Sequence, residues 1–330
     1  MKKLVLNTLA ISVLMGSSIS IVKAESLVGV TIYQYDDTFM NLMKDEISNQ
    51  ASALKDVKFL MNDSQNSQAV QNNQIDILLA KKVKVLAVNL VHTAAATTLI
   101  EKAKQQQVPI IFFNKDPGEK ILSSYDKAYY IGSSAKSSAI EQAHLIAKHW
   151  NKYPELDLNK DGKIQYALLK GEPESTAAIT RSQYVIEELH NLGLKTQPVF
   201  SDTAMWNSDM AKDRMDLWLN DTQGNNIEVI ISNNDAMAIG ALASLQEHHK
   251  KLPIFSVDAL PRALRFVKSG DITGTVLNDG VTQSRVLVKL AHDLALGKPM
   301  NKNADWALEN NSIRTPDIAI DQDNIDKFLK

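Results

Sequence analysis

The chain has 330 residues, of which 44% are hydrophobic and 22% charged, with a formal net charge of −2 and no cysteine. This length allows two domains with a core each, and the composition is that of globular proteins, not of disordered ones. The lack of cysteine excludes a disulfide framework, a thiolate zinc site and a lipid-modified cysteine anchor, and the weak negative charge gives no support to nucleic acid or an anionic membrane as partner.

The first 24 residues are organised like a signal peptide. The chain begins with MKK, continues with an apolar run over 4–22, and reaches the small residue Ala24 before Glu25. A basic start, an apolar centre and a small last residue are typical of a cleaved secretory signal. A membrane anchor is the alternative, but Asn7 and five serine or threonine residues weaken the run as a span. We expect cleavage after Ala24 and a location in the bacterial periplasm.

From residue 27 onwards, short β-branched runs alternate with amphipathic segments. The run over 27–33 is followed by apolar residues spaced for one face of a helix, namely Phe39, Met43, Ile47, Ala51 and Leu54. Further strands are predicted at 57–62, 83–90, 108–114 and 128–133, and a second series at 164–171, 196–200, 228–234, 253–258 and 273–278. Strands that alternate with helices in this way predict an α/β protein with two doubly wound parallel-sheet lobes.

Polar residues follow nearly every predicted strand. They occur in the segments YQYDDTF, FFNKDP, KGEPES, SNNDAM, SVDALP and VLNDG. Ligands of open α/β sheets bind beyond the carboxyl ends of the strands, and amides and carboxylates beside aromatic rings suit the hydroxyls and the C–H face of a sugar. Asp and Asn in such places are also ordinary helix caps and turn residues, but their repetition favours a cleft that binds a sugar.

The stretch DLNKDGKIQ, residues 157–165, has the pattern of the first part of a calcium-binding loop. Oxygen-bearing side chains stand at loop positions one, three, five and nine, the seventh residue would offer its backbone carbonyl, and a glycine stands at the sixth. These residues are Asp157, Asn159, Asp161, Gln165, Lys163 and Gly162. The twelfth position holds Leu168 where an EF-hand has Glu. The loop is therefore either a calcium site whose last ligand comes from elsewhere or a polar turn without metal.

Several segments together resemble the family of periplasmic galactose/glucose-binding proteins, which are type I periplasmic binding proteins. They are GVTIYQYDDTFM, MNDSQNSQ, FFNKDP, SYDKAYYIG, LLKGEP, DTAMW, NNDAMAIGA, VDALP and GTVLND, and the likeness extends from residue 27 to the C-terminus. It implies a monomer that captures a hexose or hexoside of the galactose, glucose or methyl-galactoside type by hinge closure. Such a protein delivers the monosaccharide to an inner-membrane ABC permease and, in some bacteria, docks on a chemotaxis transducer.

The resemblance also implies a set of sugar-binding residues. Asp37 matches a carboxylate that accepts from a ring hydroxyl, and Phe39 and Trp206 match two aromatic platforms. Further hydrogen-bonding positions are matched by Asn114, Arg181, Asn234, Asp258 and Asn278. Two positions depart from the family, because Ser175 and Ala177 stand where it has a His facing the exocyclic side of the sugar and an Asp facing the reducing-end hydroxyl.

These departures leave three readings open. A hexose binds with water in the gaps, or Glu174 and Ser175 move in as replacements, or the site takes a different sugar derivative with an acidic or C1-substituted group. Each lost hydrogen bond to a charged partner costs about 1.5–3 kcal/mol. With Ala177 in place of an acid, we also expect Arg181 to lack a neighbouring carboxylate.

For the loop over 157–165, the resemblance implies structural Ca²⁺ and a distant bidentate ligand. The matching carboxylate is Glu228, so that the expected metal set is Asp157, Asn159, Asp161, Lys163, Gln165 and Glu228. The resemblance further implies an N-terminal lobe of residues 25–133 and 279–315 and a C-terminal lobe of residues 134–278 and 316–330. Three chain crossings near Gly132, Gly280 and Pro316 would form the hinge.

Catalysis and gene regulation are the alternative functions. The chain has no G-x-G-x-x-G after the first strand, no G-x-S-x-G and no P-loop. Asp36 and Asp37 could be imagined as the carboxylates of a sugar-processing glycosidase, but one ligand carboxylate beside one capping or solvated Asp is the simpler interpretation. A repressor with this core would need a helix-turn-helix where the signal stands. We therefore expect neither an enzyme nor a nucleic-acid partner.

Overall fold

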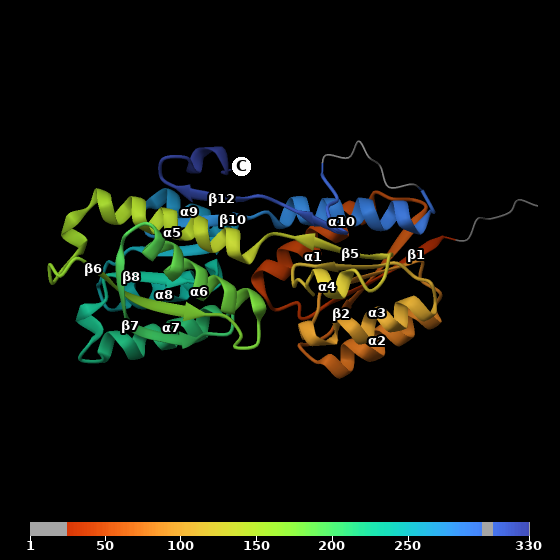
Figure 1. Ribbon diagram of the computed structural model, residues 1–330, viewed down its shortest axis with the longest axis horizontal. Coiled ribbons are helices and arrows are strands. Elements are labelled where there is room, and N and C mark those ends of the chain that lie inside the picture. Colours follow the sequence, from red (N-terminus) through yellow and green to blue (C-terminus); the bar gives the residue numbers. More distant parts are fainter. Residues whose placement is uncertain (1–24, 299–305, 330) are drawn as a thin grey trace, which may run out of the picture.

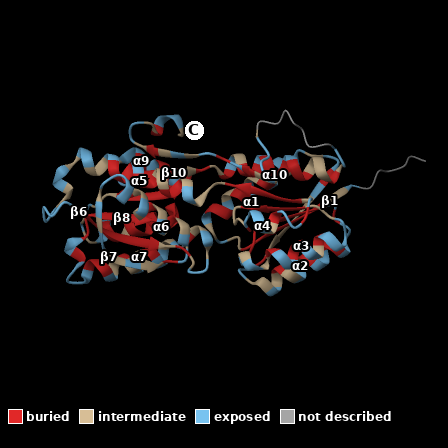
Figure 2. Ribbon diagram, in the orientation of Figure 1, coloured by how far each residue is buried: buried red, intermediate tan, exposed pale blue. Residues whose placement is uncertain are grey.

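The computed structural model describes residues 25–298 and 306–329 and shows two α/β lobes, each built on a six-stranded sheet (Figure 1). The predicted signal peptide lies outside the described residues. In the part of the chain that is described, no helix has the length and apolar character needed to cross a membrane. The central strands of both sheets are buried between helices whose outer faces are exposed (Figure 2).

The first lobe contains a fully parallel sheet with the strand order β11-β5-β4-β3-β1-β2. Helices α1 and α10 cover one face, and α2 and α3 cover the other. The strands are β1 (Ser26–Ile32), β2 (Val57–Asp63), β3 (Val85–Val88), β4 (Ile110–Phe113), β5 (Ala128–Gly132) and β11 (Ser312–Arg314). The helices are α1 (Thr38–Ser52), α2 (Gln68–Ala80), α3 (Ala96–Gln105), α4 (Glu119–Leu122) and α10 (Gly280–Ala295).

The second lobe contains a sheet with the order β12-β10-β9-β8-β6-β7, in which only β12 is antiparallel to its neighbour among the described strands. Helices α5 and α6 cover one face, and α7, α8 and α9 the other. The strands are β6 (Lys163–Lys170), β7 (Lys195–Thr203), β8 (Val229–Ser232), β9 (Ile254–Asp258), β10 (Gly274–Asn278) and β12 (Asp317–Asp321). The helices are α5 (Ala135–Lys152), α6 (Thr176–Asn191), α7 (Ser208–Asn220), α8 (Asp235–Glu247) and α9 (Pro261–Ser269).

The two doubly wound lobes predicted from the sequence are confirmed. A strand is present at each predicted place, with ends that differ by a few residues. Two short strands, β11 and β12, were not predicted, because each lies at the edge of a sheet and lacks the buried β-branched run that marks a central strand. They place the last part of the chain in both lobes.

The chain passes between the sheets three times, after β5, after β10 and after β11. Hydrogen bonds join these three crossings. The buried Gln283 donates through Nε2 to Asn278 Oδ1 at 2.7 Å and to Thr315 Oγ1 at 3.1 Å. The amide of Thr315 donates to the carbonyl of Gly132 at 2.9 Å. A Cβ at Gly132 would lie 2.0 Å from the hydroxyl of Tyr130, so a side chain at this crossing would displace that ring.

Candidate functional site

A cavity of about 600 Å³ is lined by residues of both lobes, where the strands of each sheet end. Its wall contains every residue of the predicted sugar-binding set. Asp37, Phe39 and Asn114 come from the first lobe, and Arg181, Trp206, Asn234, Asp258 and Asn278 from the second. The two departing positions, Ser175 and Ala177, also line it. Side chains from separate strands thus meet in one cavity, because the carboxyl ends of parallel strands lie at the same edge of a sheet.

Asp37 has a fixed orientation on the first-lobe side of the cavity. Its Oδ1 accepts from the amide of Met40 at 2.8 Å, which caps α1, and its Oδ2 accepts from the hydroxyl of Tyr33 at 2.7 Å. Burial raises the pKa of Asp37, and the hydrogen bonds from Met40 and Tyr33 oppose that shift. A carboxylate oxygen has two lone pairs, so Asp37 can still accept from a ligand while it caps the helix.

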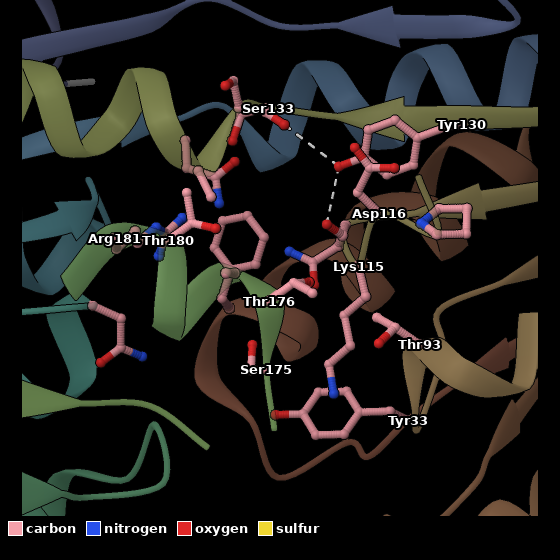
Figure 3. A pocket seen from close by; sticks show the side chains of 18 of the residues that line it. Tyr33, Thr93, Lys115, Asp116, Tyr130, Ser133, Ser175, Thr176, Thr180 and Arg181 are labelled. Carbon is pink, nitrogen blue, oxygen red and sulfur yellow. Dashed lines mark hydrogen bonds between the residues drawn. The ribbon is translucent and has the colours of Figure 1, made fainter. Parts of the chain in front are cut away.

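Lys115 joins the two lobes beside Asp37. Its ammonium lies 3.9 Å from the centre of the Tyr33 ring and 3.3 Å from Oε2 of Glu172 (Figure 3 shows Lys115 over Tyr33). Lys115 follows β4 of the first sheet, whereas Glu172 follows β6 of the second. Burial lowers the pKa of Lys115, and Glu172 opposes that shift. Sequence reasoning missed this residue, although it directly follows Asn114 in FFNKDP.

Arg181 and Asp258 form the polar wall of the second lobe. Arg181 donates through Nη1 to the carbonyl of Asn233 at 2.8 Å and lies 3.9 Å from Asp258 Oδ1. Asn278 donates to the same Oδ1 at 3.2 Å. The expectation that Arg181 lacks a neighbouring carboxylate is therefore wrong, because the end of β9 supplies one from far along the chain. Burial raises the pKa of Asp258; Arg181 opposes the shift, and the buried Asp235 adds to it.

Three residues of the predicted set adopt a left-handed backbone. Trp206 has φ +62°, Asn114 has φ +63° and Asp258 has φ +129°. Such conformations cost free energy in residues other than glycine and concentrate at functional sites. A Cβ at Gly171 would lie 2.1 Å from Cζ2 of Trp206, so the indole lies directly on the backbone of that glycine.

The two departing positions contribute little to the wall beyond their small size. Ser175 is the N-cap of α6, where its Oγ accepts from the amide of Ala178 at 3.4 Å. Ala177 presents only a methyl group to the cavity. Glu174 is exposed and lies outside the wall, so the structure does not place it as a replacement for an absent acid.

Much of the wall was not predicted from the sequence. The additional lining residues include Tyr33, Thr93, Lys115, Asp116, Tyr130, Ser133, Lys136, Thr176, Thr180 and Arg314. Several directly follow a strand, as Lys115 and Asp116 follow β4, and could have been found by extending the search beyond the first polar residue. Arg314 belongs to the unpredicted strand β11 and carries no such signal.

The loop over 157–165 is held together by its own acidic side chains. Asp157 accepts from the amides of Asp161 at 3.1 Å and Gly162 at 2.9 Å, and Gly162 has the φ of +71° that its turn requires. Glu228 is only 2% exposed. Its Oε1 accepts from the amide of Leu158 at 2.7 Å and its Oε2 from that of Gln165 at 2.9 Å. The structure therefore brings Glu228 to this loop.

The loop has the chemistry of a calcium site. Its potential donors are all oxygens, the atoms that Ca²⁺ prefers. Oε1 of Gln165 is buried and has no hydrogen-bond partner, which leaves one oxygen free for a cation. Among the described residues, however, no group of three His, Cys, Asp or Glu side chains is arranged to hold a metal. The acids of the expected set thus lie near one another but are occupied by backbone amides.

Comparison with known proteins gives the family. The model of the periplasmic binding protein domain matches residues 28–299. The chain is 52% identical to the D-galactose/methyl-galactoside binding periplasmic protein MglB of Haemophilus influenzae over 329 residues, which cover 100% of this chain and 99% of that protein. It is 22% identical to the ribose import binding protein RbsB of Bacillus subtilis, with 87% of each chain covered.

Solved structures show the same fold. An ABC transporter solute binding protein from Bacillus halodurans with bound myo-inositol matches with a TM-score of 0.79 and 24% identity, over 93% of this chain and 98% of that one. A periplasmic solute binding protein from Actinobacillus succinogenes with bound D-allose matches with a TM-score of 0.78 and 18% identity, over 92% and 100%. The resemblance seen in the sequence is confirmed: the chain belongs to the periplasmic binding protein family.

Proposed function

We propose that the protein captures a hexose, D-galactose or a simple galactoside, in the cavity between its lobes and delivers it to an ABC transporter of the inner membrane. The observation that carries this proposal is the joining of carboxylates, amides, a guanidinium and two aromatic side chains from both lobes in one cavity. The name of the Haemophilus influenzae relative, which is 52% identical, supports galactose and methyl galactoside as ligands.

The groups of the wall suit the hydroxyls of a sugar. Asp37 and Asp258 accept hydrogen bonds, Arg181 donates them, and the amide of Asn114 does both. Phe39 and Trp206 line the cavity from opposite lobes and offer apolar faces to the ring. A sugar that contacts both lobes favours the closed form over the open one by the free energy of the contacts made only on closure.

Calorimetric titration of D-galactose and D-glucose into protein refolded from denaturant, to remove bound sugar, tests the proposal. We expect saturable binding by the wild type. Trp206→Ala should abolish binding and leave the fold intact, since its ring lines the cavity and is only partly buried where it packs against the edge of the core. The control is Trp150→Ala, which changes a tryptophan of α5 away from the cavity. Binding by Trp206→Ala with wild-type affinity would contradict the site assignment.

We further propose that the loop over 157–165 and Glu228 hold a structural calcium ion. Asp157, Asn159, Asp161 and Gln165 would provide side-chain oxygens, Lys163 its carbonyl and Glu228 its carboxylate. When bound, the ion would neutralise acids that lie close together, and Oε1 of Gln165, which has no hydrogen-bond partner, would coordinate it. Its effect would be on stability, because the loop runs into the start of β6 and no residue of it lines the cavity.

The Glu228→Gln variant tests the calcium site through thermal unfolding with calcium and with chelator. The side-chain NH₂ of glutamine cannot accept the backbone N–H that Glu228 accepts now, so the variant should be less stable even in chelator. Its calcium-dependent rise in Tm should also be lost; ligand at a hundredfold excess over Kd adds about 2.7 kcal/mol to the wild type. Exposed Glu187→Gln is the control. An equal calcium-dependent rise in Glu228→Gln and wild type would refute the assignment.

Export through a cleaved signal peptide is part of the proposal. Residues 1–24 would direct the chain to the periplasm and be removed after Ala24, which mass spectrometry of the exported protein would check at Glu25. We regard the protein as a transport component and not as an enzyme. Docking on a chemotaxis transducer and a monomeric state stay predictions from the family resemblance.

A further inference from the structure

The chain makes a sharp turn directly after β9, where Asp258 reaches the cavity wall. Asp258 has φ +129°, and the next residue, Ala259, has φ +57°. Left-handed backbone at two successive residues that are not glycine costs free energy and persists only where the surrounding structure holds it. Pro261 then begins α9. Contacts from outside the turn must therefore fix its backbone.

Two buried side chains supply these contacts. The amide of Ala259 donates to Oγ1 of Thr275 at 3.3 Å, and the amide of Leu260 donates to Oδ2 of Asp235 at 2.6 Å. Neither Thr275 nor Asp235 has any exposed surface. A buried backbone N–H needs a hydrogen-bond partner, and here side chains of β10 and α8 provide it where the sheet ends. The two amides that directly follow Asp258 are thus fixed from outside the turn.

Asp235 and Thr275 also hold each other in place. While the hydroxyl of Thr275 accepts from the amide of Ala259, it donates to Oδ1 of Asp235 at 2.7 Å. The hydroxyl of Ser256, the register partner of Thr275 on β9, donates to the same oxygen. Asp235 stands in the first turn of α8, where the helix dipole favours a negative charge. With three donors bound to it, this carboxyl group is a fixed support for the turn.

The carboxyl group of Asp258 itself has few contacts. Its Oδ1 accepts from Asn278 at 3.2 Å and lies 3.9 Å from Nη1 of Arg181. Among the described residues, none donates a hydrogen bond to its Oδ2. The residue lines the cavity, so this oxygen can accept from a ligand. The direction in which the carboxyl group faces the cavity therefore depends chiefly on the backbone that carries it.

We propose that Thr275 is a positioning residue of the sugar site: its hydroxyl, together with Asp235, holds the left-handed turn that directs Asp258 into the cavity. Thr275 is not part of the cavity wall, so it acts through Asp258 and not by contact with the ligand. A hydroxyl is required because the same group accepts from an amide and donates to a carboxylate. Valine has nearly the same shape and can do neither. The inference rests on the proposed function and adds a residue that acts from behind the wall.

Calorimetric titration of D-galactose into Thr275→Val and Thr275→Ser tests this role, with denaturant unfolding of each variant beside it. Thr275→Val leaves the amide of Ala259 without its acceptor, so the turn should relax and galactose affinity should fall by about tenfold. Thr275→Ser keeps the hydroxyl and should bind galactose within about twofold of the wild type.

The matched control is Thr273→Val, which removes a hydroxyl with a similar bond away from the cavity. Oγ1 of Thr273 accepts from the amide of Ile254 at 3.1 Å, and Thr273 lies just before β10 and outside the cavity wall. This variant should lose stability and keep its galactose affinity. The comparison therefore separates a loss of affinity caused by the turn from one caused by a less stable lobe.

The outcomes separate this inference from the function on which it rests. Weaker galactose binding by Thr275→Val, with affinity kept by Thr275→Ser and Thr273→Val, supports it. Wild-type affinity in Thr275→Val overturns it and leaves the proposed function standing. An equal loss of affinity in Thr275→Ser also overturns it, because the hydroxyl is then not the group that matters.

Two further results would assign Thr275 to the fold and overturn its positioning role. One is an equal loss of affinity in Thr273→Val, because affinity then follows stability. The other is a Thr275→Val variant that does not fold. If the wild type itself does not bind galactose, the proposed function fails together with the inference.

Discussion

Asp258 combines an uncommon backbone conformation with burial of its carboxyl group, and ligand binding explains this combination better than folding does. Its φ is +129°, it is 6% exposed, and it shares the cavity wall with Arg181. The second buried acid, Asp235, is the more deeply placed and accepts from Thr275 at 2.7 Å and from the amide of Leu260 at 2.6 Å. Two acids so close to one guanidinium cannot both be ionised without cost. A ligand that donates hydroxyls to Asp258 would relieve that cost.

The raised pKa of Asp258 predicts a dependence of stability on pH. Its pKa is higher in the folded than in the unfolded chain, so folding binds a proton and the free energy of unfolding falls as pH rises above about 4, the ordinary pKa of Asp. In the sugar-free protein, Asp258→Asn should lose less stability over this range, with slopes that differ by at most about 1.4 kcal/mol per pH unit. Denaturant unfolding at several pH values measures both curves.

The control for this prediction is Asp209→Asn, at an exposed position in the first turn of α7. Its stability should depend on pH as that of the wild type does. Parallel curves for wild type and Asp258→Asn would show that Asp258 is ionised in the folded protein throughout, and would contradict the prediction.

At the scale of elements, cap and ligand positions coincide. Asp37 begins α1, Ser175 begins α6 and Asn234 begins α8, and all three line the cavity. The sequence presented capping and sugar binding as alternatives for the polar residues after strands, but the structure shows that one side chain can do both. Asn114 and Asp258, by contrast, cap no helix in the described chain. Spacing alone could not separate the two groups, because members of both stand at the end of a strand or within a few residues of it.

Substitution of Asn234 separates its two roles. Oδ1 of Asn234 accepts from the amide of Met237 at 3.0 Å, which caps α8, while its side-chain NH₂ faces the carbonyl of Trp206 at 3.4 Å. Asn234→Ser keeps a good cap and Asn234→Ala removes it, so the alanine variant should be less stable by about 1 kcal/mol. Both remove the amide group and should weaken galactose binding equally. Denaturant unfolding measures the stabilities and calorimetry the galactose affinities. Equal stability of the two variants would contradict the capping role of Asn234. Galactose affinities equal to that of the wild type would contradict its ligand role.

At the scale of the whole molecule, the lobes could be predicted because buried parallel strands have a strong local signal. The three crossings, and the joining of Asn114 to Arg181 in one cavity, depend on contacts between residues far apart in sequence. The family resemblance supplied the binding set, and no local pattern could have supplied it. Contacts specific to this structure, such as Lys115 with Glu172 and Asp116 with Arg314, were missed for the same reason.

The ion pair of Lys115 and Glu172 should stabilise the closed form of the cleft. Their charged atoms are 3.3 Å apart, their side chains are 12% and 17% exposed, and they belong to different lobes, so the contact is lost when the cleft opens. A hydrogen bond between charged groups contributes about 1.5–3 kcal/mol. Glu172→Gln removes the charge and leaves the ammonium of Lys115 partly buried without its partner. We therefore expect galactose affinity to fall by about tenfold, with a larger open fraction in small-angle scattering.

A double-mutant cycle distinguishes this explanation from general damage. Lys115→Met with Glu172→Gln removes the unpaired ammonium, so the double variant should bind galactose more tightly than the sum of the two single effects predicts. Lys102→Met removes an exposed pair with Asp76 inside the first lobe and should not change affinity. If Glu172→Gln binds galactose as the wild type does, the pair contributes nothing to closure, and the differential contacts that hold the lobes together must come from the sugar itself.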